Sequence, residues 1–262
     1  MREFTAEYLE HTRRGMWEST AALEPLDLGS RERVLDVGCG TGELARVLAA
    51  ETPGEVIGVD ADTDLLAVAR EQAGIPTVAG DATRLPFRDD AADLVVCQAL
   101  LINLPDPVAA VREFRRVSSD LVAAIEPNNA AVEVSSTVDA EERLEREVRE
   151  AYLAGVETDV AMGERVSDLF ASAGIEVVDR RTYEHEKLVE PPYSEPAMES
   201  AAKKASGAGI AEHERELRAA GADYDDLRAA WREMGREVVE EMAAETYRRR
   251  EVVPFEVTVG RV

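Results

Sequence analysis

The stretch Val34–Gly42, with the sequence VLDVGCGTG, constrains the fold of this chain more than any other. Val34–Val37 is typical of a short buried strand, glycines follow at positions 38, 40 and 42, and Glu43–Ala50 predicts a helix. Glycine lets backbone N–H groups approach a ligand, and the first N–H groups of a helix are unpaired. The stretch therefore predicts a ligand-binding turn in an α/β sheet, with a purely structural glycine turn as the alternative.

The spacing of the glycines separates the candidate ligands. A dinucleotide fingerprint has the pattern Gly-x-Gly-x-x-Gly. Here the third glycine comes one residue early, and Glu43 occupies the place of the expected glycine. A carboxylate at that place would oppose a pyrophosphate, so the spacing disfavours NAD and FAD.

The rest of the chain alternates predicted strands and helices with short links. Strands are predicted at 33–37, 55–59, 76–79, 93–97, 121–125, 175–183 and 252–262, and helices at 43–50, 63–73, 107–117, 139–153 and 166–173. This order predicts a doubly wound, mostly parallel α/β sheet. Residues 3–28 predict an N-terminal helical cap, and 130–163 and 184–250 predict two helical insertions.

The second insertion contains an amphipathic helix. Apolar side chains recur every three or four residues from Tyr224 to Met242, which predicts one apolar face. That face needs a partner. Its own domain is the simplest one; a substrate or a second copy in a homodimer are the alternatives.

The charge balance is strongly acidic. The 262 residues include 30 basic and 54 acidic side chains, for a net charge of −24. Such a charge strains a compact fold by self-repulsion, which molar salt screens because the Debye length falls to about 3 Å. We interpret the chain as a salt-adapted cytoplasmic protein of halophile type, with an ordinary acidic protein as the alternative. Nucleic-acid binding is disfavoured, because it requires a basic face.

Cysteine content and hydropathy exclude several classes of protein. Cys39 and Cys97 form neither a disulfide framework nor a zinc-binding spacing, so we expect reduced thiols and no metal site. The first residues lack the apolar core of a signal peptide. No stretch reaches the roughly 18–20 apolar residues of a membrane span, so no membrane association is expected.

Four motifs in order resemble the class I S-adenosylmethionine (SAM)-dependent methyltransferases over about residues 30–128. They are VLDVGCGTG, then GVD ending the second strand, GDA after the third, and LPF…DLVVC…LPDP. The resemblance implies a seven-stranded sheet with 252–262 antiparallel near its edge, and in-line methyl transfer from SAM to a small molecule, releasing S-adenosylhomocysteine (SAH). The domains expected are 1–29 as cap, 30–183 as SAM-binding core, 184–250 as lid and 251–262 as the last core strand.

The resemblance also implies which residues bind SAM. The glycine turn would underlie the methionine part and Asp36 would hold its amino group, while Asp60 would accept from both ribose hydroxyls. The full set of implied cofactor-binding residues is Asp36, Gly38, Cys39, Gly40, Gly42, Asp60, Ala61, Asp81, Ala82, Gln98 and Arg14. For each acid the alternative is a local capping or turn-forming role, and for Arg14 it is a solvated surface side chain.

The catalytic residues are not predicted by the motifs. Many small-molecule relatives carry a histidine pair before LPDP, where this chain has Ile102 and Asn103. His185 is the best-placed histidine and the candidate base, with a structural histidine as the alternative. Two other functions remain open: a methyltransferase acting on tRNA or protein, and a non-catalytic SAM- or SAH-binding protein.

Overall fold

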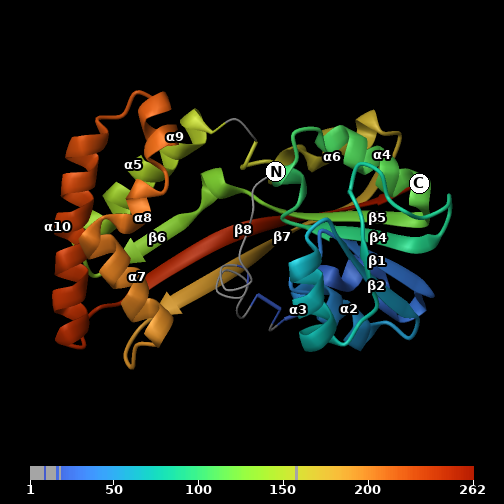
Figure 1. The fold of residues 1–262 in the computed structure, drawn as a ribbon, viewed down its shortest axis with the longest axis horizontal. Coiled ribbons are helices and arrows are strands. Elements are labelled where there is room, and N and C mark those ends of the chain that lie inside the picture. Colours follow the sequence, from blue (N-terminus) through green and yellow to red (C-terminus); the bar gives the residue numbers. More distant parts are fainter. Residues whose placement is uncertain (1–8, 10–15, 18, 157–158) are drawn as a thin grey trace. The chain divides into compact units, whose positions relative to one another are not determined.

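The computed structural model describes residues 9, 16–17, 19–156 and 159–262. The chain forms two compact units (Figure 1). Unit 1 comprises residues 1–128, 161–183 and 254–262, and unit 2 comprises 129–160 and 184–253. Most of the expected N-terminal cap lies outside the described residues. Its described part contains two short 3-10 helices, η1 (Ala21–Leu26) and η2 (Leu28–Ser30).

Unit 1 is built on a mostly parallel sheet. Its strands are β1 (Arg33–Val37), β2 (Glu55–Asp60), β3 (Thr77–Ala79), β4 (Ala92–Gln98), β5 (Ser118–Pro127), and parts of β7 (Glu176–Val189) and β8 (Arg249–Arg261). The order is β3-β2-β1-β4-β5-β8, and β7 pairs with β8. Strands β1 to β5 are parallel, and β8 is antiparallel to β5. The doubly wound fold and its antiparallel last strand are confirmed.

Helices cover both faces of this sheet (Figure 1). They are α2 (Glu43–Glu51) and α3 (Thr63–Ala73) on one face, and α4 (Pro107–Val117) and α6 (Val166–Ser172) on the other. Phe114 of α4 and Phe170 of α6 are fully buried against the sheet. Both faces are covered, which suits the continuous apolar runs at 94–97 in β4 and 121–125 in β5. These runs predicted the middle of each strand, while β5 also includes three residues before its run and two after it.

Unit 2 has its own core. It contains β6 (Glu133–Ser136), paired with the first residues of β8, and the helices α5 (Asp139–Gly155), α7 (Glu195–Ser206), α8 (Ala208–Ala211), α9 (Glu214–Ala219) and α10 (Tyr224–Ala243). The apolar face of α10 is buried in this core, with Trp231 and Met234 among its members. Its partner is therefore its own domain, and the homodimer prediction loses the free apolar face on which it depended.

The structure differs from the expected fold in its strands. The sheet has eight strands, one more than expected, because β6 lies in a segment that was predicted to be a helical insertion. Strand β7 continues to Val189, so the first residues of 184–250 form a strand. Both segments are short of apolar residues, and their order comes from pairing with β8, which a local pattern does not reveal. No helix among the described residues combines the length and the apolar character needed to cross a membrane.

Candidate functional site

The glycine turn after β1 depends on glycine at three positions. Gly38, Gly40 and Gly42 have φ values of +74°, +54° and +84°, a region that residues with a Cβ rarely adopt. The N–H groups of Gly38 and Cys39 donate to the carbonyl of Val59 at 2.7 and 3.0 Å. The turn is therefore held against the carboxyl end of β2, and it opens directly into α2.

Asp60 connects the end of β2 to this turn. Its Oδ2 accepts from the N–H of Gly40 at 2.8 Å, and its Oδ1 accepts from the N–H of Asp62 at 2.9 Å. Each carboxylate oxygen can accept a second hydrogen bond, and the side chain is half-buried, so Asp60 can also serve a ligand. The capping role and the ligand role are compatible here. Ala61, the next residue, is exposed.

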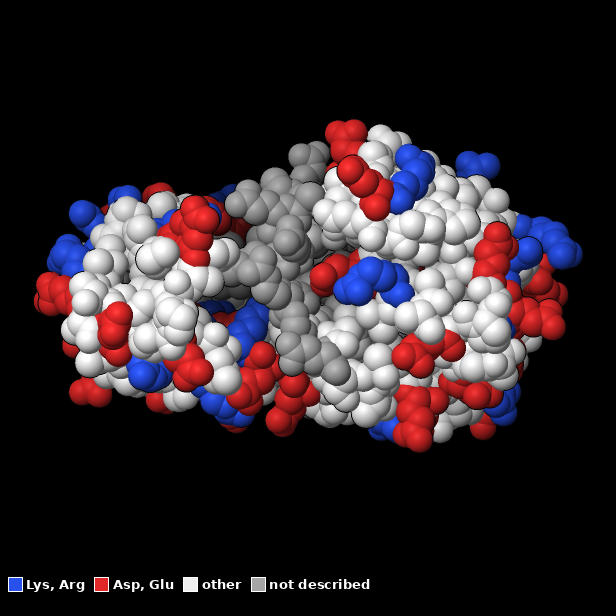
Figure 2. All heavy atoms as spheres, turned by 90° about the horizontal axis from the view of Figure 1, so that it is seen from below, with Lys and Arg blue, Asp and Glu red and all other residues white. Residues whose placement is uncertain are grey.

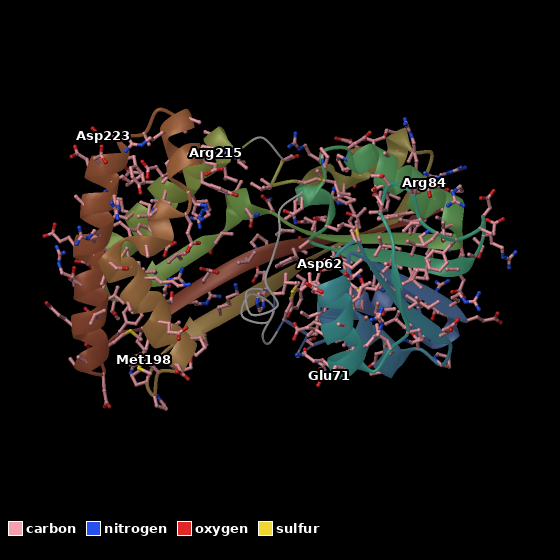
Figure 3. The ribbon with its side chains drawn as sticks, in the orientation of Figure 1. Asp62, Glu71, Arg84, Met198, Arg215 and Asp223 are labelled. Carbon is pink, nitrogen blue, oxygen red and sulfur yellow. The ribbon has the colours of Figure 1, made fainter. Side chains whose placement is uncertain are left out.

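Asp62 and Asp81 also accept hydrogen bonds from the backbone near the strand ends. Asp62, labelled in Figure 3, lies at the start of α3. Its side chain accepts from the N–H groups of Asp64 and Leu65. Asp81 follows β3, and its Oδ1 accepts from the N–H and the hydroxyl of Thr83, both at 2.8 Å. These bonds, the backbone one first, lower the pKa of Asp81. Its Oδ2 has no hydrogen-bond partner among the described residues, and Ala82 beside it is buried.

Two buried polar side chains end or interrupt the central strands. Asp36 lies in β1 and is 1% exposed, and Gln98 ends the neighbouring β4 and is 2% exposed. Gln98 donates from Nε2 to the sulfur of Met16 at 2.8 Å, while its Oε1 has no partner among the described residues. A buried amide oxygen normally accepts a hydrogen bond, so this oxygen fits a ligand that carries N–H or O–H groups.

The loop after β4 is held by an acid that the sequence analysis did not single out. Glu126, at the end of β5, is fully buried and accepts from the N–H groups of Leu100, Leu101 and Ile102 at 3.0, 2.9 and 3.4 Å. Burial raises the pKa of Glu126 to about 7, although these N–H groups act in the opposite direction. The sequence signal that could have identified Glu126 is its position as an acid at the carboxyl end of a buried central strand.

The position before LPDP carries a structural amide. Asn103 ends the short helix η3 (Leu101–Asn103), is buried, and donates from Nδ2 to the carbonyl of Ala99 at 2.8 Å. Ala99 itself has a φ of +49°, which is unusual for alanine. This side chain therefore supports the loop, and the structure places no histidine there.

Two further predicted residues lie outside the described part of unit 1. Arg14 lies outside the described residues. His185 belongs to unit 2, where it is 2% exposed in the second half of β7, and it stays a prediction. Among the described residues, no three His, Cys, Asp or Glu side chains form a group that could hold a metal ion.

Unit 2 has a groove of about 470 Å³ between α5 and β6. A volume of this size accommodates a small molecule. Its charged lining is balanced between three arginines and three glutamates: Arg146, Arg149, Arg250, Glu133, Glu142 and Glu150. On the face drawn in Figure 2, acidic and basic side chains of the described residues are similarly interspersed.

Comparison with known proteins identifies the first part of the chain. Residues 35–120 match a family model described as a methyltransferase domain. A demethylmenaquinone methyltransferase of Lactiplantibacillus plantarum is 41% identical over 101 residues, which is 35% of this chain and 43% of that protein. One of Staphylococcus aureus is 38% identical over 99 residues, 35% of this chain and 41% of that protein. The match therefore spans less than half the length of either relative.

Solved structures with a similar fold cover between 72% and 96% of the chain. A putative methyltransferase of Bacillus halodurans has a TM-score of 0.52 at 16% identity, covering 92% of this chain and 99% of that chain. A second similar chain comes from a structure described as the complex between the Haloferax volcanii Trm112 methyltransferase activator and the putative methyltransferase. Its TM-score is 0.52 at 18% identity, and the match covers 96% of this chain and 92% of that chain. A SAM-dependent methyltransferase of Aquifex aeolicus has a TM-score of 0.51 at 18% identity, covering 72% and 93%.

Proposed function

We propose that this chain, which contains a class I SAM-dependent methyltransferase domain, transfers a methyl group from SAM to a small molecule. The observation that carries the proposal is the double role of Asp60, which ends β2 and binds Gly40 of the glycine turn. An acid able to hold the ribose is thereby fixed to a turn able to hold the methionine part. The names of the curated relatives support a small acceptor.

The described residues fit SAM in distinct ways. We assign the glycine turn to the methionine part, Asp36 to its amino group and Asp60 to the ribose hydroxyls. The Oδ2 of Asp81, which has no partner among the described residues, is assigned to the adenine amino group. The buried Oε1 of Gln98 is assigned to the donor groups of the methionine end. Gly38, Cys39, Gly42, Ala61 and Ala82 contribute backbone and shape.

The chemistry requires little of the protein beyond positioning. When bound, SAM supplies a methyl group on a positively charged sulfur. The chain must align the acceptor at roughly 3 Å and exclude water. Because Asn103 supports the loop where relatives carry histidine, any base that removes a proton from the acceptor must come from elsewhere. We infer that acceptor choice depends on residues outside the matched segment 35–120.

Calorimetry tests the cofactor assignment. SAM, SAH and NADH are titrated separately into the full chain in molar KCl. We expect SAM and SAH to bind well below millimolar and NADH not to bind. Failure of both SAM and SAH to bind below millimolar would overturn the proposed function, and tight binding of NADH would favour an oxidoreductase.

A second experiment tests the acceptor class. With SAM as the methyl donor, SAH release is measured separately with three acceptors: a reduced demethylated naphthoquinone, bulk tRNA and unfractionated protein. The naphthoquinone is chosen from the names of the curated relatives. We expect turnover only with the small acceptor, or with a small-molecule extract if the naphthoquinone is not the substrate. Turnover with tRNA or protein would favour a macromolecular acceptor. SAH binding without turnover on any of the four would favour a non-catalytic binding protein. We also propose a salt-rich cytoplasm as its location, from its charge.

A further inference from the structure

We propose that Glu126 is a positioning residue of the SAM site, which holds the loop after β4 against the glycine turn through its carboxylate. The proposal rests on the proposed function, because it concerns the same cofactor. Glu126 is at the end of β5, one strand away from Gln98 at the end of β4, and Ile125 is the register partner of Gln98. The carboxyl ends of these parallel strands meet at one edge of the sheet, which is where ligands of such folds bind.

A continuous set of contacts runs from Glu126 to the turn. The Oε1 of Glu126 accepts from the N–H of Leu100 at 3.0 Å and of Leu101 at 2.9 Å, and Oε2 accepts from Ile102 at 3.4 Å. The side chain of Leu100 in turn lies directly over Gly38, since a Cβ at Gly38 would be 2.8 Å from a Leu100 methyl carbon. Removing the carboxylate should therefore release Leu100 from the turn.

The loop carries backbone strain at Ala99, and hydrogen bonds on both sides of that residue hold it. Ala99 has a positive φ and its N–H donates to the carbonyl of Ile125 at 2.9 Å, while its own carbonyl accepts from Asn103. A positive φ at a residue with a Cβ persists only where the surrounding bonds enforce it. The three N–H groups bound by Glu126 extend this support to the residues that follow Ala99.

The ionised form of Glu126 is the form that binds the loop best, because charge-assisted hydrogen bonds are about twice as strong as neutral ones. The groups that face Glu126 are the thiol of Cys97 on β4, with a sulfur–oxygen distance of 3.7 Å, and Glu256, its register partner on β8. Glu256 is itself held by the hydroxyl of Thr182 and lies near Arg180, both on β7. Asp36 of β1 acts on the Cys97 thiol through its charge. Burial gives Glu126 a pKa of about 7, so its charge changes near neutral pH.

Three variants separate the steps of this arrangement. Glu126→Leu removes the carboxylate, and Glu126→Gln keeps one acceptor oxygen without the charge. Leu100→Ala keeps the carboxylate and removes the contact with Gly38, together with the packing of Leu100 on the core. Glu256→Gln is the matched control, because Glu256 is a buried acid opposite Glu126 that binds Thr182 and not the loop. Each is compared with the unaltered chain by amide hydrogen exchange without ligand, and by calorimetry with SAH between pH 5.5 and 8.5.

We expect Glu126→Leu to speed amide exchange at Leu101 and Ile102 and to weaken SAH at least tenfold, as loss of two or more charge-assisted hydrogen bonds implies. Leu100→Ala should weaken SAH while exchange at Leu101 and Ile102 stays unchanged. At low pH, Glu126→Gln should regain most of the SAH affinity that Glu126→Leu loses. The unaltered chain should lose SAH affinity about fivefold as the pH falls below 7, whereas Glu126→Gln should show no such change. Glu256→Gln should keep the pH dependence of SAH affinity and shift the midpoint of that dependence to lower pH.

The outcomes distinguish this proposal from the proposed function. If the unaltered chain does not bind SAH, the proposed function fails, and the exchange data still test whether Glu126 holds the loop. If SAH binds but Glu126→Leu leaves both exchange and affinity unchanged, the positioning role is wrong. An identical pH profile in Glu126→Gln and the unaltered chain also contradicts it, and this test holds even if the leucine variant fails to fold.

Discussion

Replacing Asp60 by alanine should separate a ligand role from a structural one. The carboxylate accepts two backbone hydrogen bonds, at 2.8 Å from Gly40 and 2.9 Å from Asp62. Hydrogen bonds to charged groups contribute about 1.5–3 kcal/mol, and the half-buried position favours the low end. Asp60→Ala should therefore lower the free energy of unfolding by about 2–3 kcal/mol. Two ribose hydroxyls bound at about 1.5 kcal/mol each would weaken SAH roughly 100-fold.

Asp62→Ala is the matched control for this experiment. Asp62 is two residues away and also accepts two backbone N–H groups, but as the cap of α3. Its loss should cost about 1 kcal/mol of stability and leave SAH affinity within about threefold. Both variants are measured by urea unfolding and by calorimetry with SAH. If Asp60→Ala and Asp62→Ala change SAH affinity equally, the ribose assignment of Asp60 is refuted.

Three further predictions concern stability. Gly235→Ala should destabilise unit 2 by at least about 2 kcal/mol in urea unfolding, because the added Cβ would lie 2.3 Å from the backbone of α7. Gly209→Ala is the control: its Cβ would have nothing within 4 Å, so this change should be neutral or stabilising by about 0.5–1 kcal/mol. The pKa of Glu126 is raised from 4.5 to about 7, so the folded state binds the proton more tightly than the unfolded state. The resulting stability, up to about 3 kcal/mol, is present below pH 4.5 and is lost as the pH rises through 7. Glu126→Gln should lack this contribution, and a difference in stability between it and the unaltered chain that stays constant between pH 4.5 and 7 would contradict the assignment. The thermal midpoint should rise when KCl increases from 0.1 to 2 M, because salt screens the net charge of −24; an unchanged midpoint would oppose salt adaptation.

The parts of the fold that the sequence predicted well are those with strong local signals. Strand β1 begins and ends at the predicted residues, and α3 begins after Asp62 and ends before Gly74, as a capping acid and a terminal glycine indicate. Strand β6, by contrast, has only four residues and one buried side chain, Val134. Its pairing partner is more than a hundred residues later in β8, so no local pattern could reveal it.

In the candidate site, too, the residues with a local sequence signal were predicted and those whose role depends on the tertiary fold were not. Asp60 was identifiable because it ends a strand in a motif with a fixed spacing, although its bond to Gly40 was not. Glu126 was passed over because its importance depends on which strand lies beside β5 and on how the loop after β4 folds back over it. The role of Asn103 as a loop support likewise depends on the conformation of Ala99.

The division into two units has a consequence for synthesis on the ribosome. The chain crosses between the units four times, after residues 128, 160, 183 and 253. Unit 1 lacks the strand beside β5 until residues 254–262 have emerged, and unit 2 lacks the partner of β6 until Arg249–Val252 have emerged. Neither unit can therefore complete its fold before β8 has emerged, and both depend on this one strand. A variant that lacks β8 should have two incomplete cores, and such a product would be a target for proteolysis.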